Sequence, residues 1–373
     1  MMKNPSPQKK NRFTAVCIAL TAACAALFFV ISAVISENRP FAALFGRWSR
    51  FISAVLGQIF SVFPFPAAQA VVIMCVFALI FLAVRFVKTM ISSGSKGILA
   101  VRAAAFVLAC ASSVFFLFNA LWGFQYSADS QKVAQKLSLS PLQADADDLY
   151  SLTYLLLNRA NESAQNVKRS SNGECDFGTF DDMAERAASA CRALSNKYDG
   201  FSAPAYPRVK RVVAGEIMSA FGVAGIYFPF TGECNVNPDN VTTHLPMTMC
   251  HEMFHRLSAM SEDECNFMAI LACVESEDAD FLYSGWLCAY IYASNSLYTA
   301  APDRAEELAL LRSDEVSGDI ARLNAHIKKY EGPVSDAGSA INDTYLKSMN
   351  QPEGMKTYGM VTDLLLSYFK DEY

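Results

Sequence analysis

Charged residues are scarce in this chain of 373 residues. Only 18% of the residues are Asp, Glu, Lys or Arg, whereas 53% are hydrophobic, which is too apolar for an ordinary soluble protein of this length. The net charge is −5, and no basic stretch is interleaved with aromatic residues. Proteins that bind a phosphate backbone need such a patch, so we expect no nucleic acid among the partners. Histidine is scarcer still, because the chain holds four, which leaves few places for imidazole chemistry.

A regular cysteine pattern is also missing. Of the eleven cysteines, four fall in the apolar stretches near the N-terminus and seven follow them. An odd number without regular spacing is a poor disulfide framework, so we infer no disulfide.

Long apolar runs are what the sequence has instead. Three uncharged stretches lie within the first 125 residues, at about 13–35, 66–84 and 103–124. At ~1.5 Å per residue, a helix of such length crosses about 30 Å of hydrocarbon. A buried core helix is the alternative interpretation of each stretch. The first stretch could also be a cleaved signal peptide, but it is longer than the usual apolar core of one and lacks a clear small-residue cleavage site. The sequence predicts a lipid bilayer as partner, a three-helix membrane anchor over 1–125 and a further domain over 126–373.

Basic residues beside the runs predict the orientation of the chain in the membrane. Four precede the first run and four lie between the second and third, and both groups favour the cytoplasmic face: Lys3, Lys9, Lys10, Arg12, Arg85, Lys88, Lys96 and Arg102. Three arginines in the first loop oppose this: Arg39, Arg47 and Arg50. That loop has apolar residues at helical spacing and can lie in the membrane interface. We therefore expect a cytoplasmic N-terminus and an extracytoplasmic domain.

The second part of the chain is predicted to be mostly helical with a small β element. Residues 142–164 and 180–198 have apolar residues at three- and four-residue spacing, which is typical of amphipathic helices. A further helix is predicted over residues 303–330, directly after Pro302, and Gly318 is the position where it could be interrupted. The aromatic-rich stretch 225–237, "GIYFPFTGECNVN", has the character of a strand.

The stretch "MCHEMFHRL" at 249–257 carries the clearest chemistry. His251 and His255 are one helical turn apart, so both imidazoles project from one face and can share a metal ion. Glu252 is rotated by ~100° from His251, which places its carboxylate beside such a metal. There it can take a proton from a water whose pKa Zn²⁺ has lowered. The pattern predicts a zinc site with Glu252 as general base, and two hydrogen-bonded helix-face histidines are the alternative.

A third protein ligand is expected, because catalytic zinc keeps three and leaves one position for water. Ser261 and Glu264 form a capping-box pattern, which predicts that a second helix begins there. Glu262 then lies in its first turn, four residues before Asn266 on the same face. This arrangement resembles metallopeptidases in which a Glu is the third ligand and an Asp or Asn braces its helix. We favour Glu262 as the ligand, Glu264 as the alternative and Asn266 as the bracing residue.

A second resemblance, to a whole protein family, extends along most of the chain. "NALWGFQYS", "GVAGIYFPFTGECNVN", "MCHEMFHR", "EDECNFMAILAC", "YSGWLCAYIYASNSLY" and "YLKSMNQPEGMKTYGMVTDLLLSYF" occur in that order, and together they resemble the bacterial membrane family called domain of unknown function 3810. The resemblance implies a few N-terminal spans followed by a zincin-like, mainly helical domain with an inferred peptidase activity. The residues that fall on matching positions are His251, Glu252, His255, Glu262, Glu264 and Asn266. Two departures are Arg256–Ser258, where the family commonly has Gln and Gly, and Leu282, where it often has Arg.

Further residues are assigned by analogy with zincin-type peptidases. In these enzymes an extended substrate pairs with an edge strand, and a Tyr or His donates a hydrogen bond to the oxyanion. The stretch 225–237 is the candidate strand, and Tyr227 or Tyr283 is the candidate donor, with a core or surface role as the alternative for either. Cys250 adjoins His251, but neighbours on a helix diverge by ~100°, so we expect a packing role.

These observations lead to one functional expectation and two alternatives. We expect a membrane-anchored zinc metallopeptidase that acts on a peptide or protein substrate. One alternative is a catalytically silent membrane sensor or scaffold that binds zinc or a peptide. The other is a zinc hydrolase of a non-peptide bond, such as a cell-wall amide.

Overall fold

The computed structural model describes the whole chain except residues 1–6, 129–132, 140–144, 199, 258–260 and 349–357. Lys3 of the predicted basic flank and Ser258 of the family comparison lie outside the described residues. The chain is 75% helical with one small sheet, so the predicted fold class, mainly α with transmembrane-type helices at the N-terminus, is confirmed. It divides into two compact units, one of residues 1–49 and 67–130 and the other of residues 50–66 and 131–373. The segment Arg50–Pro66 therefore belongs with the second unit, although the sequence placed it in the anchor.

The first unit is built from long apolar helices that expose their side chains. Helix α1 packs against α4, and the unit also holds the first half of α2. No residue in the most apolar part of α3 is buried, and few are in α1 and α4. All three are long and apolar enough to cross a membrane, which indicates membrane association. The bounds are α1 (Pro7–Glu37), α2 (Arg39–Phe60), α3 (Ala67–Ser92), α4 (Lys96–Phe118) with a π-helical turn at Asn119–Gly123, and α5 (Gln125–Ala128).

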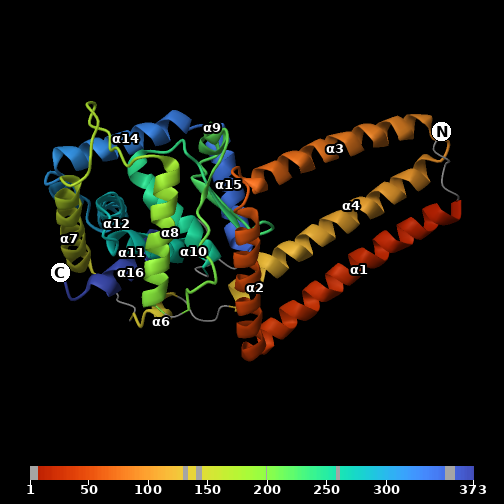
Figure 1. Ribbon diagram of the computed structural model, residues 1–373, viewed down its shortest axis with the longest axis horizontal. Coiled ribbons are helices and arrows are strands. Elements are labelled where there is room, and N and C mark those ends of the chain that lie inside the picture. The colour runs from red at the N-terminus through yellow and green to blue at the C-terminus, as the bar shows by residue number, and fades with distance from the viewer. Residues whose placement is uncertain (1–6, 129–132, 140–144, 199, 258–260, 349–357) are drawn as a thin grey trace. The chain divides into compact units, whose positions relative to one another are not determined.

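The second unit surrounds a buried helix, α10, with other helices and one sheet (Figure 1). Helices α8, α11 and α12 and strands β2 and β3 all pack against α10. The helices are α6 (Val133–Lys136), α7 (Ala146–Ala164), α8 (Phe180–Lys197), α9 (Gly215–Ala220), α10 (Leu245–Arg256), α11 (Glu262–Val274), α12 (Ala279–Ala300), α13 (Pro302–Ala309), α14 (Asp314–Tyr330), α15 (Pro333–Ser348) and α16 (Tyr358–Phe369). A 3-10 turn, η2 (Thr242–His244), precedes α10.

Side-chain caps explain where these helices begin. The described part of the first predicted amphipathic helix starts at Ala146, because Asp145 accepts hydrogen bonds from the N–H groups of Asp147 and Asp148. The prediction of one helix over 303–330 interrupted at Gly318 is wrong. The break lies between α13 and α14, where Ser313 caps the new helix by accepting from the Val316 N–H. Gly318 lies inside α14, because the cap at Ser313, five residues earlier, already sets the start of that helix.

The predicted strand is a hairpin. Strands β2 (Gly225–Phe228) and β3 (Glu233–Val236) are antiparallel, and Gly232 supplies the left-handed conformation (φ +64°) that the connection requires. The short strand β1 (Lys210–Arg211) pairs in parallel with β3, which gives the order β1-β3-β2. Strand β2 is therefore an edge strand, and it lies against α10.

Candidate metal centre

Helix α10 presents its two histidines on one face. Pro246 occupies its first turn, where a missing backbone N–H costs nothing, and the helix is continuous to Arg256. The side chains of Met249, Cys250 and Phe254 are fully buried, so the helix is fixed on its other sides. Nε2 of His251 and Nε2 of His255 lie 3.1 Å apart. The one-turn spacing thus brings the two imidazoles together as the sequence predicts.

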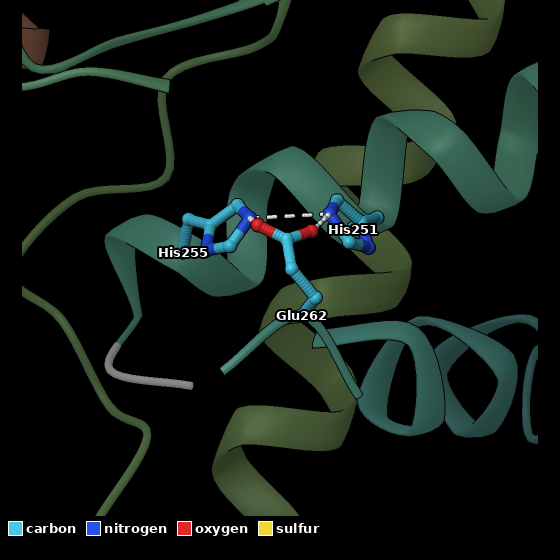
Figure 2. Close-up of side chains that lie close together, drawn as sticks. All are labelled: His251, His255 and Glu262. Carbon is cyan, nitrogen blue, oxygen red and sulfur yellow. Dashed lines mark hydrogen bonds and ion pairs between the residues drawn. The ribbon is translucent and has the colours of Figure 1, made fainter. Parts of the chain in front are cut away.

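Helix α11 supplies the third group. Ser261 caps it by accepting from the Glu264 N–H, and Glu262 is its first residue. The carboxylate of Glu262 reaches both imidazoles, with 3.2 Å from Oε2 to Nε2 of His251 and 3.6 Å from Oε1 to Nε2 of His255 (Figure 2). His255 is buried and the His251 side chain is only 12% exposed, whereas the Glu262 side chain is 33% exposed, so the cluster opens to solvent on the Glu262 side.

The cluster is compact enough to hold a metal ion. Tetrahedral Zn²⁺ with bonds of about 2.0–2.2 Å holds neighbouring ligand atoms roughly 3.3–3.6 Å apart. The two Nε2 atoms lie 3.1 Å apart, Oε2 of Glu262 lies 3.2 Å from His251, and its other oxygen, Oε1, lies 3.6 Å from His255. One ligand atom from each of the three residues lies within 4.8 Å of the others, so small side-chain adjustments would bring the three to zinc-ligand separations. Two imidazoles and a carboxylate are also a common donor set of catalytic zinc. Within the part of the chain that the structure describes, this is the group of His, Cys, Asp and Glu side chains spaced to hold a metal ion.

Two neighbours on α11 orient the imidazoles. Nδ1 of His251 lies 2.8 Å from Oδ1 of Asn266, and Nδ1 of His255 lies 3.1 Å from Sγ of Cys265. When the His251 ring is neutral, an Nδ1–H donated to the Asn266 oxygen leaves the lone pair on Nε2, which faces the cluster. The sequence predicts the Asn266 contact, but it gives no sign of Cys265. Cys265 and His255 lie on different helices, so no periodic spacing links them.

Charge within the cluster favours a cation at its centre. Burial lowers the pKa of His251, but the hydrogen bond and negative charge of Glu262 outweigh it and raise this pKa to about 9. Burial opposes ionisation of Glu262 as well, yet the charge of His255 and the hydrogen bond to His251 hold its pKa well below the usual range. The carboxylate therefore stays ionised and attracts positive charge to the space between the imidazoles.

Glu252 lies against the edge strand. Its side chain is buried, and Oε2 makes no hydrogen bond of ordinary geometry with any described residue. A Cβ added at Gly225 would lie 2.5 Å from Oε1 of Glu252, so only glycine lets the strand approach the carboxyl group this closely. Burial raises the pKa of Glu252, against the lowering effects of His251 and His255 and of the Tyr227 backbone. An unpartnered buried carboxylate oxygen is poised to accept a proton from a molecule that enters the site.

Glu264 does not join the cluster. Its carboxylate accepts a hydrogen bond from the Val133 N–H at 2.8 Å, which ties α6 to α11. The predicted cap at Ser261 is present, but the reciprocal half of the capping box is replaced by this longer-range contact.

The hydroxyls of the two candidate tyrosines lie beside other polar groups. The backbone of Tyr227 lies beside Glu252, while its buried hydroxyl lies beside Ser53 of α2. The hydroxyl of Tyr283 donates to Oδ2 of Asp319 at 2.6 Å. Burial raises the pKa of both phenols, so both stay protonated. An oxyanion role stays a prediction for either, and Tyr283 would have to give up its Asp319 bond to take it.

The comparison with known families covers most of both units. Residues 47–366 match the family described as "Protein of unknown function (DUF3810)". The chain belongs to this family. The matched range includes α3, α4 and the cluster residues on α10 and α11. No curated protein and no solved structure matches the DUF3810 chain.

Proposed function

We propose that this DUF3810 protein is a membrane-anchored, zincin-like zinc metallopeptidase. The observation that carries the proposal is the cluster itself. Two imidazoles and one carboxylate converge within reach of a single metal ion, and among the described residues the buried Oε2 of Glu252 makes no hydrogen bond of ordinary geometry. Hydrogen-bonded helix-face histidines would need neither feature.

Each residue has a defined part in this proposal. His251, His255 and Glu262 would hold the metal, and Asn266 and Cys265 would keep the rings aimed at it. Zn²⁺, when bound there, would lower the pKa of a water molecule and polarise a substrate carbonyl. Glu252 would accept the proton of the attacking water at Oε2 and pass it to the leaving amine, and its raised pKa suits it to both transfers.

The edge strand favours a peptide over other substrates. Strand β2 ends the sheet, and its residue Gly225 touches Glu252. An extended peptide added to that edge would carry its backbone past the carboxylate, since strand addition aligns main-chain groups. A cell-wall amide would gain nothing from a strand edge.

Replacing Glu252 by Gln in the full-length protein tests the proposal. The ligands remain while the proton acceptor is lost, so zinc content should stay near one per chain while peptide hydrolysis falls by about 10²–10⁴-fold. Glu264→Gln removes an equal charge outside the cluster and is the matched control. Glu252→Gln with full turnover on a peptide found by library profiling would refute the general-base role. Zinc binding without hydrolysis of any peptide would point to a sensor or scaffold, and hydrolysis confined to non-peptide amides to the other alternative.

We also propose that the second unit lies outside the cytoplasm of a bacterial cell. The support is the pair of basic flanks, of which the described members include Arg12, Arg85 and Arg102. A reporter fused after Tyr373 should be active only if it works outside the cytoplasm, and protease added to spheroplasts should digest the domain. Cytoplasmic reporter activity with a protected domain would reverse the orientation and leave the zinc chemistry untouched.

A further inference from the structure

The segment Arg50–Pro66 of the second unit exposes a row of large apolar side chains. In the second half of α2, Phe51, Val55 and Ile59 lie on one face of the helix, and 54%, 36% and 55% of their surfaces are exposed. The same helix face continues with Trp48 one turn earlier and Leu44 two turns earlier, and Val62, Phe63 and Phe65, just after the helix, are exposed as well. We call this row the α2 stripe. Contiguous apolar surface of this kind marks a binding face.

The opposite face of α2 is part of the second unit's interior. Ser53 and Ala54 are buried, and a Cβ at Gly57 would lie 2.7 Å from the Gly232 carbonyl, so helix and hairpin backbones touch. Nζ of Lys210 donates to the carbonyls of Phe60 and Phe65 at 2.7 and 3.0 Å, which ties β1 to the C-terminal end of the helix. The stripe is therefore rigidly joined to the sheet.

The same sheet, together with α10, connects the α2 stripe to the metal centre. The hairpin meets α2 at Gly232 and meets Glu252 at Gly225, the far end of β2. Arg256, the residue after His255, lies 3.5 Å from where a Cβ at Gly57 would be. A four-residue strand of ~3.3 Å per residue and a helix ~10–12 Å across put Glu252 within roughly 25 Å of the stripe.

Chain connectivity identifies what covers the stripe. Pro66 is followed directly by Ala67, the first residue of a helix able to cross a membrane, and α2 begins two residues after another such helix ends. Both ends of α2 are therefore held at one membrane surface. An amphipathic helix held there places its apolar face about 5–10 Å into the headgroup region.

We propose that the α2 stripe docks the second unit on the bilayer, so that the metal centre acts on polypeptide segments lying close to the membrane surface. The docking stands on the stripe and its connectivity, whereas the substrate class rests on the proposed peptidase function. The substrates would be membrane-anchored polypeptides cleaved near the bilayer, in preference to free soluble peptides.

Lipid contact can be measured without any activity. The exposed cysteines are Cys75 and Cys110, and the others are buried, so a Cys75→Ala/Cys110→Ala background allows one introduced cysteine to be labelled. The environment-sensitive fluorophore NBD would be placed at Ile59→Cys, or at the matched control Ile327→Cys on α14, which is 58% exposed. In full-length protein in phosphatidylcholine–phosphatidylglycerol nanodiscs, spin-labelled lipid should quench the probe at 59 several-fold more than at 327. Equal quenching at the two positions would show that water covers the stripe, and a blue shift at 59 without lipid quenching would show that protein covers it. Either result would overturn the docking. Val62→Cys repeats the test if Ile59→Cys fails to fold.

The substrate class is tested by presenting one cleavable peptide either free or on a lipid anchor in the same nanodisc. The anchored form should be cleaved roughly tenfold faster or more at equal bulk concentration, because confinement raises its effective concentration at the site. Ile59→Glu should reduce that advantage, because the undocked second unit no longer holds its metal centre at the bilayer surface, and it should leave free-peptide cleavage unchanged. Ile327→Glu should change neither rate. Equal rates for both forms would overturn the substrate class and leave the peptidase intact. No cleavage of either form, with lipid contact at 59, would refute the peptidase and leave the docking intact.

Discussion

Helix α10 carries His251, Glu252 and His255 within about one helical turn and is buried on nearly all sides, whereas α11 contributes Glu262 as its first residue. The geometry of His251 and His255 follows from helix periodicity alone. The position of Glu262 depends on how α11 packs against α10 and on the cap at Ser261. One helix is therefore a local motif, and the other is placed by tertiary contacts. Mutations in the two helices should therefore differ in their effects on zinc binding and on stability.

Loss of a histidine from α10 should have the largest effect. His255→Ala removes a ligand atom and empties a buried position, so zinc affinity should fall by more than the ~10–100-fold that loss of an outer hydrogen-bond partner costs. Unfolding should also become easier, since bound metal stabilises the folded state. Metal analysis of purified full-length protein checks this, with His326→Ala on α14 as the control. Full zinc content in His255→Ala would remove α10 from the metal site.

The next largest effect is a difference in zinc occupancy between variants of the two acidic residues of α11, Glu262 and Glu264. Glu262→Ala should lower zinc occupancy strongly, because its carboxylate reaches both imidazoles. Glu264→Ala should leave zinc in place and reduce the free energy of unfolding by about 1–3 kcal/mol through loss of the bond to Val133. Zinc content and denaturant unfolding, measured on both variants, give the ranking. The reverse order would transfer the ligand role to Glu264.

A strand residue offers a finer test of α10. Gly225→Ala places a Cβ 2.5 Å from Oε1 of Glu252, so the carboxyl group must move by about 1 Å. Displacements of that size cost up to roughly 10–100-fold in kcat/KM, while zinc content should not change. Gly359→Ala, where an added Cβ meets nothing within 4 Å, is the matched control. Unchanged kcat/KM in Gly225→Ala would show that the position of Glu252 is not critical.

The smallest effect is a pH dependence shared by the two helices. In metal-free protein the pKa of His251 rises from 6.5 to about 9 because Glu262 of α11 outweighs burial. A raised pKa stabilises the fold fully below pH 6.5, and this contribution is lost as pH rises through 9. Metal-free protein should therefore lose stability between pH 6.5 and 9 in thermal unfolding, and Glu262→Gln should flatten that slope. Zinc should bind more tightly over the same interval, because it competes with the proton.

Some features could be read from the sequence because they depend on neighbours along the chain. The three long apolar helices follow from runs of uncharged residues, and the facing of His251 and His255 follows from a spacing of four. The cap at Ser261 is similarly local. The break between α13 and α14 was mislocated because Gly318 is a weaker signal than the cap formed by Ser313.

Other features were decided by tertiary structure alone. Cys265 reaches His255, and Glu264 reaches Val133, 131 residues away, because helices distant in sequence pack together. The segment Arg50–Pro66 joins the second unit through glycine contacts between α2 and the hairpin, which no apolar count reveals. Sequence periodicity fixes which side chains share a face, since a helix or strand repeats regularly. Which faces meet depends on close packing of the whole chain, and that packing placed Glu262 between the two imidazoles.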